Sequence, residues 1–185
     1  MPFQKLGRAV LAVASTLVLA GVVAGQEMPM PKPGPEHKVL EMDAGTWEAT
    51  VEMSVPGAPP MVSKGTETNT IGCGGLCLIS DFKGTMAGAP FHGHGTTTWD
   101  PAKKKYVGTW TDSMSAGISL GESTYDAVTK TASGSMEGPD MTGKIVKSRS
   151  VVEYKDANTR VMQMFTTGPD GKEFPMMKIS YTRKN

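Results

Sequence analysis

Residues 91–114 read FHGHGTTTWDPAKKKYVGTWTDSM, and this stretch predicts one long β-hairpin. Its middle, residues 100–104, has the composition of a turn, because Asp bonds to nearby backbone and Pro presets the φ angle of a turn. If Trp99 pairs with Tyr106, an antiparallel register follows, since the numbers of paired residues have a constant sum. The other facing pairs are Thr97 and Gly108, Gly95 and Trp110, Gly93 and Asp112, and Phe91 and Met114.

One face of this hairpin is expected to be buried. It carries Phe91, Trp99, Tyr106, Trp110, Asp112 and Met114. Two glycines of the same face lie opposite Trp110 and Asp112, and an aromatic ring laid over a strand glycine covers the bare backbone. The other face carries His92 and His94 among threonines, which favours contact with water. A shift of the register by one residue would exchange the two faces.

The rest of the chain predicts further strands. In residues 46–55 apolar and polar side chains alternate, which is typical of a half-buried strand. Strand-like runs separated by turn signals follow at 62–71, 76–84, 89–99, 105–114, 116–125, 129–137, 143–154, 159–167 and 174–183. One short helix is expected at residues 35–42, with Pro35 in its first turn and Gly45 beyond its end.

Three Asp-based turns follow an aromatic residue, and they set the expected fold. They are Trp99-Asp100, Tyr125-Asp126 and Tyr154-Lys155-Asp156, and their aromatics are 26 and 29 residues apart. Two strands and two turns occupy about that length, so the three turns are expected at one end of an up-and-down meander. About ten strands in sequence order predict an all-β, antiparallel up-and-down barrel, because closure removes exposed strand edges. An open two-sheet sandwich is the alternative.

The first residues have the pattern of a secretory signal peptide. Lys5 and Arg8 precede an apolar run at 9–24 that ends in small residues. Cleavage near Ala24 or Gly25 predicts export to the periplasm or the medium. No cysteine stands directly after the cleavage point, so a lipoprotein anchor is not expected, and the apolar run is too short and too rich in small residues to favour a retained membrane span. Residues 1–25 are thus assigned to the signal, 26–34 to a Pro-rich flexible leader and 35–185 to a single β-barrel domain.

The charge balance argues against nucleic acid as a partner. Of 19 Lys and Arg residues two lie in the signal, which leaves 17 against 18 Asp and Glu, a net charge of −1. Such a chain has no basic surface excess that would hold a polyanion. The sequence leaves the oligomeric state open.

The chain contains two cysteines, Cys73 and Cys77. Export permits a disulfide. Residues four apart on an extended strand are separated by about 13 Å, whereas a disulfide needs Cα atoms within about 7 Å. The bond therefore forms only if Gly72, Gly74 and Gly75 fold the chain into a turn, and two separate thiols are the alternative.

A set of motifs spans nearly the whole predicted domain. It consists of Gly34-Pro35-Glu36-His37-Lys38, Gly45-Thr46-Trp47, Gly74-Gly75, Phe91-x-Gly93-x-Gly95, Trp99-Asp100, Lys104-Lys105-Tyr106, Trp110-x-Asp112-Ser113-Met114 and Tyr181-x-Arg183. This set resembles an uncharacterised bacterial family catalogued as domain of unknown function 1579 (DUF1579). The resemblance implies one small β-barrel, often exported, and supplies no known activity.

The motif Gly45-Thr46-Trp47 also resembles the Gly-x-Trp signature of lipocalin-like (calycin-type) barrels. In such barrels a late Arg packs over the early Trp, which implies closure of the base by Trp47 and Arg183. A more distant resemblance is to haem-binding barrels of the nitrobindin type, which use a late histidine as iron ligand. No histidine follows His94, and no cofactor is predicted.

Asp112 is the first candidate site residue, because a carboxylate inside a barrel is costly unless it is paired or hydrogen-bonded. It is either a structural anchor or a polar contact for a ligand. Arg149 and Lys147, which share one face of a predicted strand, are its candidate partners. The candidate ligand-binding set is Trp110, Asp112, Met114, Tyr106, Phe91 and Arg149.

His92 and His94 place two imidazoles on one strand face, which is half of a metal site. The remaining ligand would come from His37, Glu67 or Asp81. The register exposes these histidines to water, and exposed histidines among threonines are usually surface residues that bind no metal. Among the 14 methionines, those in strands are expected to fill the core or line an adaptable apolar cavity.

These patterns favour a non-catalytic, exported barrel that binds a small apolar or amphipathic molecule in its interior. One alternative is a metal-dependent or other enzyme centred on His92, His94 and Asp112. Another is a structural or interaction module whose interior is packed solid. Strand number alone does not decide between an open and a packed interior, because interior volume also depends on the shear of the barrel.

Overall fold

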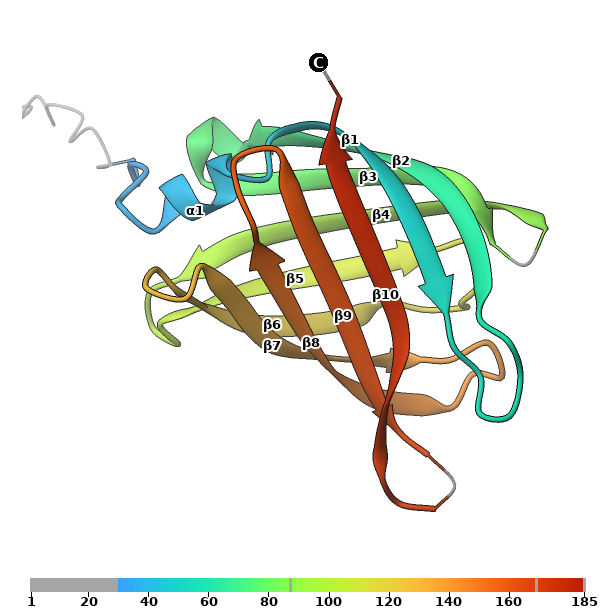
Figure 1. The fold of residues 1–185 in the computed structure, drawn as a ribbon. Helices are drawn as coiled ribbons and strands as arrows, with labels where there is room; N and C mark the ends of the chain where they lie inside the picture. The colour runs from blue at the N-terminus through green and yellow to red at the C-terminus, as the bar shows by residue number, and fades with distance from the viewer. Residues whose placement is uncertain (1–29, 87, 169, 185) are drawn as a thin grey trace, which may run out of the picture. The chain divides into compact units, whose positions relative to one another are not determined.

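The structure, a computed structural model, describes residues 30–86, 88–168 and 170–184 (Figure 1). The predicted signal peptide, and the first part of the predicted leader, lie outside the described residues. Among the described residues, no helix has the length and apolar character needed to cross a bilayer.

Ten antiparallel strands close into one barrel, in the order β1-β10-β9-β8-β7-β6-β5-β4-β3-β2 (Figure 1). They are β1 (Gly45–Met53), β2 (Met61–Gly72), β3 (Cys77–Met86), β4 (Ala89–Asp100), β5 (Lys105–Asp112), β6 (Ser119–Asp126), β7 (Thr131–Pro139), β8 (Ile145–Tyr154), β9 (Thr159–Thr167) and β10 (Glu173–Arg183). The first and last strands pair from Trp47 opposite Arg183 to Met53 opposite Met177. The barrel prediction is therefore confirmed, and the open sandwich is wrong.

The register predicted for the central hairpin is also confirmed. Trp99 pairs with Tyr106, and Gly93 pairs with Asp112. A Cβ atom on Gly93 would lie 2.2 Å from the ring of Trp110, so this ring covers the bare glycine backbone as expected. The predicted pair of Phe91 with Met114 does not form, because β5 ends at Asp112.

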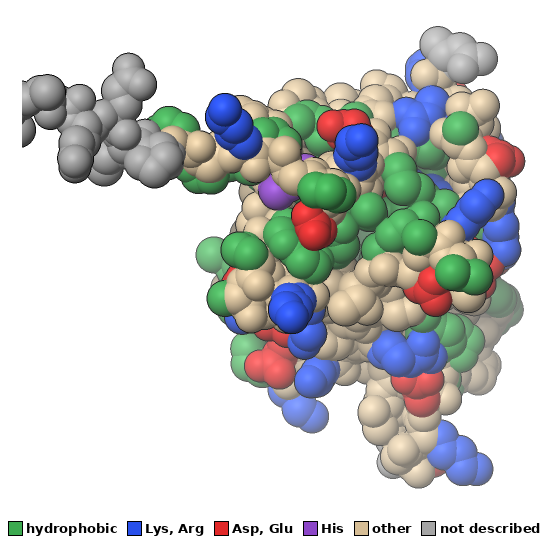
Figure 2. Space-filling view, turned by 90° about the vertical axis from the view of Figure 1, so that its left-hand side faces the viewer, with side chains coloured by type: hydrophobic (Ala, Val, Ile, Leu, Met, Phe, Trp, Pro, Cys, Tyr) green, Lys and Arg blue, Asp and Glu red, His purple; other side chains and the backbone are tan. Residues whose placement is uncertain are grey.

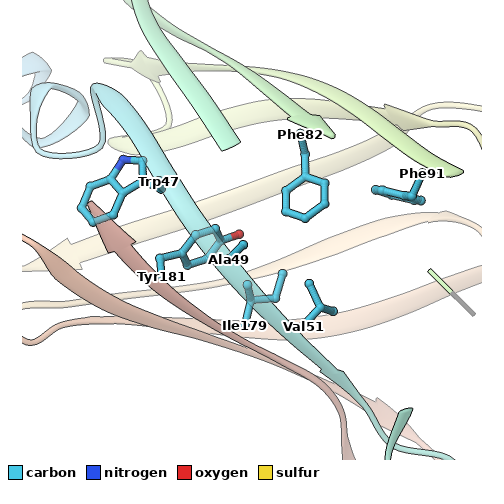
Figure 3. Packing of buried hydrophobic residues seen from close by; sticks show 7 residues of the cluster. All are labelled: Trp47, Ala49, Val51, Phe82, Phe91, Ile179 and Tyr181. Carbon is cyan, nitrogen blue, oxygen red and sulfur yellow. The ribbon is translucent and has the colours of Figure 1, made fainter. Parts of the chain in front are cut away.

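Alternation along β1 builds one side of the core. Trp47, Ala49 and Val51 point inward and are buried, while the residues between them face water or are half-buried. They pack with side chains of β3, β4 and β10, namely Phe82, Phe91, Ile179 and Tyr181 (Figure 3). The rings of Phe82 and Phe91 meet edge to face, with centroids 5.7 Å apart.

A short helix, α1 (His37–Glu41), covers one end of the barrel (Figure 1). Leu40 of this helix packs against Leu78 and Tyr106, and the Tyr106 hydroxyl donates to the carbonyl of Glu36 at 2.9 Å. Basic and acidic side chains surround an apolar centre at this end (Figure 2). The opposite end is formed by the loops β1–β2, β3–β4, β5–β6, β7–β8 and β9–β10, and we call it the mouth.

The three Asp-based turns lie at one end of the barrel, as predicted from their spacing, and this is the α1 end. In each turn the Asp carboxylate accepts backbone N–H groups two or three residues ahead. Asp100 accepts from Ala102 and Lys103, Asp126 from Val128 and Thr129, and Asp156 from Asn158. These bonds satisfy donors that a tight turn leaves without a strand partner.

A disulfide joins Cys73 to Cys77 at the same end, with Cα atoms 5.5 Å apart. The glycines between them make the turn that the bond requires. Gly74 and Gly75 have φ angles of 65° and 96°, in the region that favours glycine. The alternative of two separate thiols is therefore wrong.

Candidate binding interior of the barrel

At the α1 end the barrel interior is closed by a buried arginine, Arg160 of β9. We call Arg160 and the buried residues bonded to it the floor. The Nη1 of Arg160 donates to Asp43 Oδ1 at 2.6 Å, and its Nη2 donates to Glu67 Oε1 at 2.5 Å. The guanidinium also lies over the rings of Trp47 and Tyr181, 4.5 and 4.2 Å from their centroids. With 6% of its surface exposed, Arg160 ties β9 to β1, β2, β10 and the segment that follows α1.

Further hydrogen bonds complete this floor. The Tyr154 hydroxyl donates to Asp43 Oδ2 at 3.0 Å, and Asn69 Nδ2 donates to Glu67 Oε1 at 2.7 Å. Among the described residues, Asn69 Oδ1 and Arg160 Nε are buried without a partner in the protein. The floor is thus a polar network in which Asp43, Glu67 and Arg160 are bonded to one another, and two of its described atoms have no partner within the protein.

Burial dominates the proton equilibria of the floor. It raises the pKa of Asp43, against the opposing effect of Arg160, and the neighbouring Glu67 adds to the rise. Burial opposes the charge of Arg160, but the carboxylates of Asp43 and Glu67 outweigh it and raise the pKa of the guanidinium. Burial also raises the pKa of Tyr154 and Tyr181 well above the ordinary value. At neutral pH the floor therefore holds a permanent cation between two carboxyl groups and two neutral phenols.

The closure expected from the lipocalin-like resemblance is present. The guanidinium of Arg183 lies 4.1 Å from the centroid of the Trp47 ring, and its Nη2 donates to the carbonyl of Met42. The sequence did not lead us to predict Arg160, whose guanidinium also lies over the indole ring of Trp47. A signal existed, because Arg160, Met162 and Met164 alternate along one face of the predicted strand at 159–167, and two of these three are apolar.

Toward the mouth, several inward side chains remain partly exposed although the barrel is closed. Most of them are methionines next to one tryptophan: Met53, Met86, Trp110, Met114, Met162 and Met177. In the middle of their strands, Met136 and Met164 are half-buried as well. These inward positions keep accessible surface, whereas Val51, Phe82 and Ile179 of the same interior are buried, so the packing is looser around the methionines.

The wall formed by β6, β7 and β8 carries small side chains. Its inward positions include Ser123, Gly134 and Ser150, which pair with one another across the cross-strand ladders, and Gly121, which pairs with Met136. All four are half-buried. A Cβ atom on Gly121 would meet only ordinary contacts, at 3.6 Å or more. The interior is therefore mostly apolar, with small and hydroxyl-bearing side chains at these four positions of the β6–β8 wall.

Asp112 points inward, as predicted, and its partners are local. Its Oδ1 accepts the N–H groups of Met114 and Ser115 at 2.8 and 2.9 Å, and Oδ2 accepts the indole N–H of Trp110 at 3.1 Å. The Ser115 hydroxyl donates to the same carboxylate at 2.8 Å. These bonds anchor the β5–β6 loop and orient Trp110 at the mouth, so the structural alternative for Asp112 accounts for its partners.

Arg149 does not belong to the interior, and its predicted pairing with Asp112 is wrong. Strand β8 alternates, and the inward position next to the floor is Tyr154, so Arg149 faces outward. There it forms two hydrogen bonds to Glu173, at 2.9 and 2.7 Å, and stacks on Phe165. It lines a shallow hollow of about 620 Å³ on the outside of β5–β10, whose charged side chains are mostly in exposed ion pairs.

His92 and His94 face outward, on the opposite side of the sheet from Asp112. His94 Nδ1 lies 2.8 Å from Asp81 Oδ1, and both side chains are more than half exposed. In the described ranges no three His, Cys, Asp or Glu side chains are grouped to hold a metal ion. A centre that combines both histidines with Asp112 is therefore not assembled by this fold.

The comparisons with known proteins agree with this architecture. The model of a family described as a protein of unknown function, DUF1579, matches residues 32–183. The chain belongs to this family. The resemblance read from the sequence motifs is confirmed, and the DUF1579 match covers both the floor and the mouth. No curated protein matches the chain.

Two solved structures have similar folds at low sequence identity. Rv2717c from M. tuberculosis is 11% identical, with a TM-score of 0.61 over 82% of this chain and 99% of that one. An S-type phycobiliprotein lyase from Guillardia theta is 10% identical, with a TM-score of 0.56 over 81% of this chain and 93% of that one. At these identities the similarity concerns the fold alone, a β-barrel.

Proposed function

We propose that this protein is an exported carrier or sensor that binds a small apolar or amphipathic molecule in the barrel interior, without catalysis. The observation that carries the proposal is the partial exposure of inward methionines and Trp110 inside a closed barrel. An apolar wall that stays in contact with water gains free energy when a ligand replaces that water.

The two walls suggest the shape of the ligand. Methionine is flexible and polarizable, so the apolar side adapts to rings or branched chains without one fixed geometry. Opposite it, Ser123 and Ser150 offer hydroxyl groups that donate or accept one hydrogen bond each. The floor presents no free charge, because Arg160 is occupied by Asp43 and Glu67. We therefore expect an uncharged, mostly apolar ligand with one or two polar atoms.

A fluorescence titration tests the proposal. N-phenyl-1-naphthylamine, an uncharged apolar fluorophore, should gain emission on saturable binding to the exported protein. Substitution of Gly121 by Leu places a side chain into the interior from a position with room for a Cβ atom. We expect this variant to bind the probe at least about tenfold more weakly. The leucine side chain occupies space that the probe would fill, so the probe buries less apolar surface.

Thr124→Leu is the matched control, because Thr124 lies on the same strand but faces outward and is exposed. It should bind the probe as the wild type does. Circular dichroism must show that both variants keep the β-fold. If the wild type gives no saturable signal, or if Gly121→Leu binds as tightly as the wild type, the interior is not the binding site. Such a result would favour the alternative of a structural or interaction module with a solidly packed interior.

A further inference from the structure

Exposed apolar side chains gather at the mouth. Nine large apolar side chains of the described residues are exposed, and seven of them lie in or beside the mouth loops. These seven are Val55, Met61, Val62, Ile118, Leu120, Met141 and Ile145. Single exposed apolar residues need no explanation, but a concentration of them around one opening marks a contact surface.

Two of the mouth loops are uncharged, whereas the mouth loops β7–β8 and β9–β10 carry Asp140, Lys144, Asp170 and Lys172. Residues 54–62 and 113–120 contain no Lys, Arg, Asp or Glu, whereas the turn at 100–105 alone contains four lysines or aspartates beyond Pro101 and Ala102. We call these two uncharged segments the rim. The rim is continuous with the interior, because Met53 precedes the first segment and Trp110 and Asp112 precede the second.

The composition of the rim favours lipid over a protein partner. Binding hot spots of protein interfaces are rich in Trp, Tyr and Arg, and poor in Leu and Val. The rim contains no Trp, Tyr or Arg, and its large side chains are aliphatic or thioether. Such side chains enter acyl chains without removing a charge from water. The absence of basic residues from the rim means that anionic headgroups are not required.

We propose that the rim inserts shallowly and reversibly into the surface of a lipid layer, so that the mouth opens toward the acyl chains. This inference rests on the proposed function, because it names lipid as the phase with which the interior exchanges its apolar ligand. The partner is a zwitterionic or uncharged lipid surface, and insertion is driven by the apolar rim alone.

Vesicle flotation tests the inference with protein purified after export and vesicles of pure phosphatidylcholine. The wild type should float with the vesicles, and added salt should not release it. Val62→Ser combined with Leu120→Ser removes two rim side chains that are 65% and 62% exposed. We expect this double variant to partition at least about tenfold less, as the loss of two inserted aliphatic side chains requires.

The matched control is Val128→Ser. Val128 is 92% exposed and lies in the β6–β7 turn at the α1 end, so its replacement removes a highly exposed apolar side chain without touching the rim. This control should float as the wild type does. Equal flotation of the rim variant and the wild type, or a comparable loss in the control, would overturn the inference.

Two other outcomes would also reject it. Binding that requires phosphatidylglycerol and disappears with salt would identify an electrostatic contact away from the rim. A dimer in sedimentation velocity that the rim variant abolishes, without flotation of the wild type, would assign the rim to a second copy. Probe binding separates the two proposals: a rim variant that binds N-phenyl-1-naphthylamine but does not float supports both, whereas flotation without probe binding rejects the ligand site alone.

Discussion

At the scale of single residues, the ion pairs of Arg160 with Asp43 and Glu67 are expected to stabilise the floor. Substitution by Met would leave Asp43 and Glu67 buried without their cation, and breaking a buried pair in this way costs about 3–5 kcal/mol. We expect a loss of that size in the free energy of unfolding, measured with urea at neutral pH.

Arg149→Met serves as the comparison for this prediction. Its ion pair with Glu173 is about half exposed, and solvent screens such pairs. The loss should therefore be much smaller than for Arg160. Similar losses in the two variants would mean that the floor network does not stabilise the fold more than a surface pair does.

At the scale of elements, the disulfide tightens the connection between β2 and β3. It closes a loop of only four residues of sequence separation, and chain entropy predicts a contribution of about 2 kcal/mol for a loop of this size. We expect replacement of Cys73 and Cys77 by Ser to lower the free energy of unfolding by that amount and to leave the β-sheet circular dichroism unchanged. Loss of the β-fold would instead show that the bond is required to form the turn.

The elements were predictable from the sequence to a large extent. Alternation in β1, the Asp-based turns and the glycines opposite Trp110 fixed strand positions, register and the common end of three turns. These signals are local, because each depends on residues within one hairpin. The pairing of Gly93 with Asp112 followed from the turn at Asp100 alone.

The partners of individual site residues were less predictable. Arg149 and Arg160 are both arginines in predicted strands, yet one faces water and the other forms the floor. The difference arises from β8–β9 pairing and from Asp43, which lies 117 residues before Arg160 in the chain. No local pattern encodes such a contact. Asp112 shows the opposite case, because its partners within three residues were within reach of turn chemistry.

At the scale of the whole molecule, the buried tyrosines of the floor set an alkaline limit to stability. The folded-state pKa values of Tyr154 and Tyr181 lie above the ordinary value near 10, chiefly because of burial. An acid whose pKa is higher in the folded state contributes its full stability below the unfolded pKa. That contribution is lost as the pH rises above about 10. We expect the urea midpoint to fall over this range and phenolate absorbance to rise with unfolding.

Tyr181→Phe tests this assignment, because it keeps the ring beside Arg160 and removes one titrating hydroxyl. Its urea midpoint should fall less steeply with alkaline pH than that of the wild type. An unchanged slope would show that other groups govern the alkaline limit.

The pairing of β1 with β10 has a consequence for how the molecule forms. Residues 47 and 183 are neighbours in the sheet but almost the whole domain apart in the chain. During synthesis every strand from β2 to β9 can meet a neighbour already made, whereas β1 has one edge that stays open until β10 emerges. Contacts of such long range close slowly, because the loop entropy is lost before the contact is gained. A nascent chain that ends before residue 173 therefore carries an open edge ready to pair with another chain, and the last dozen residues decide between a closed barrel and aggregation.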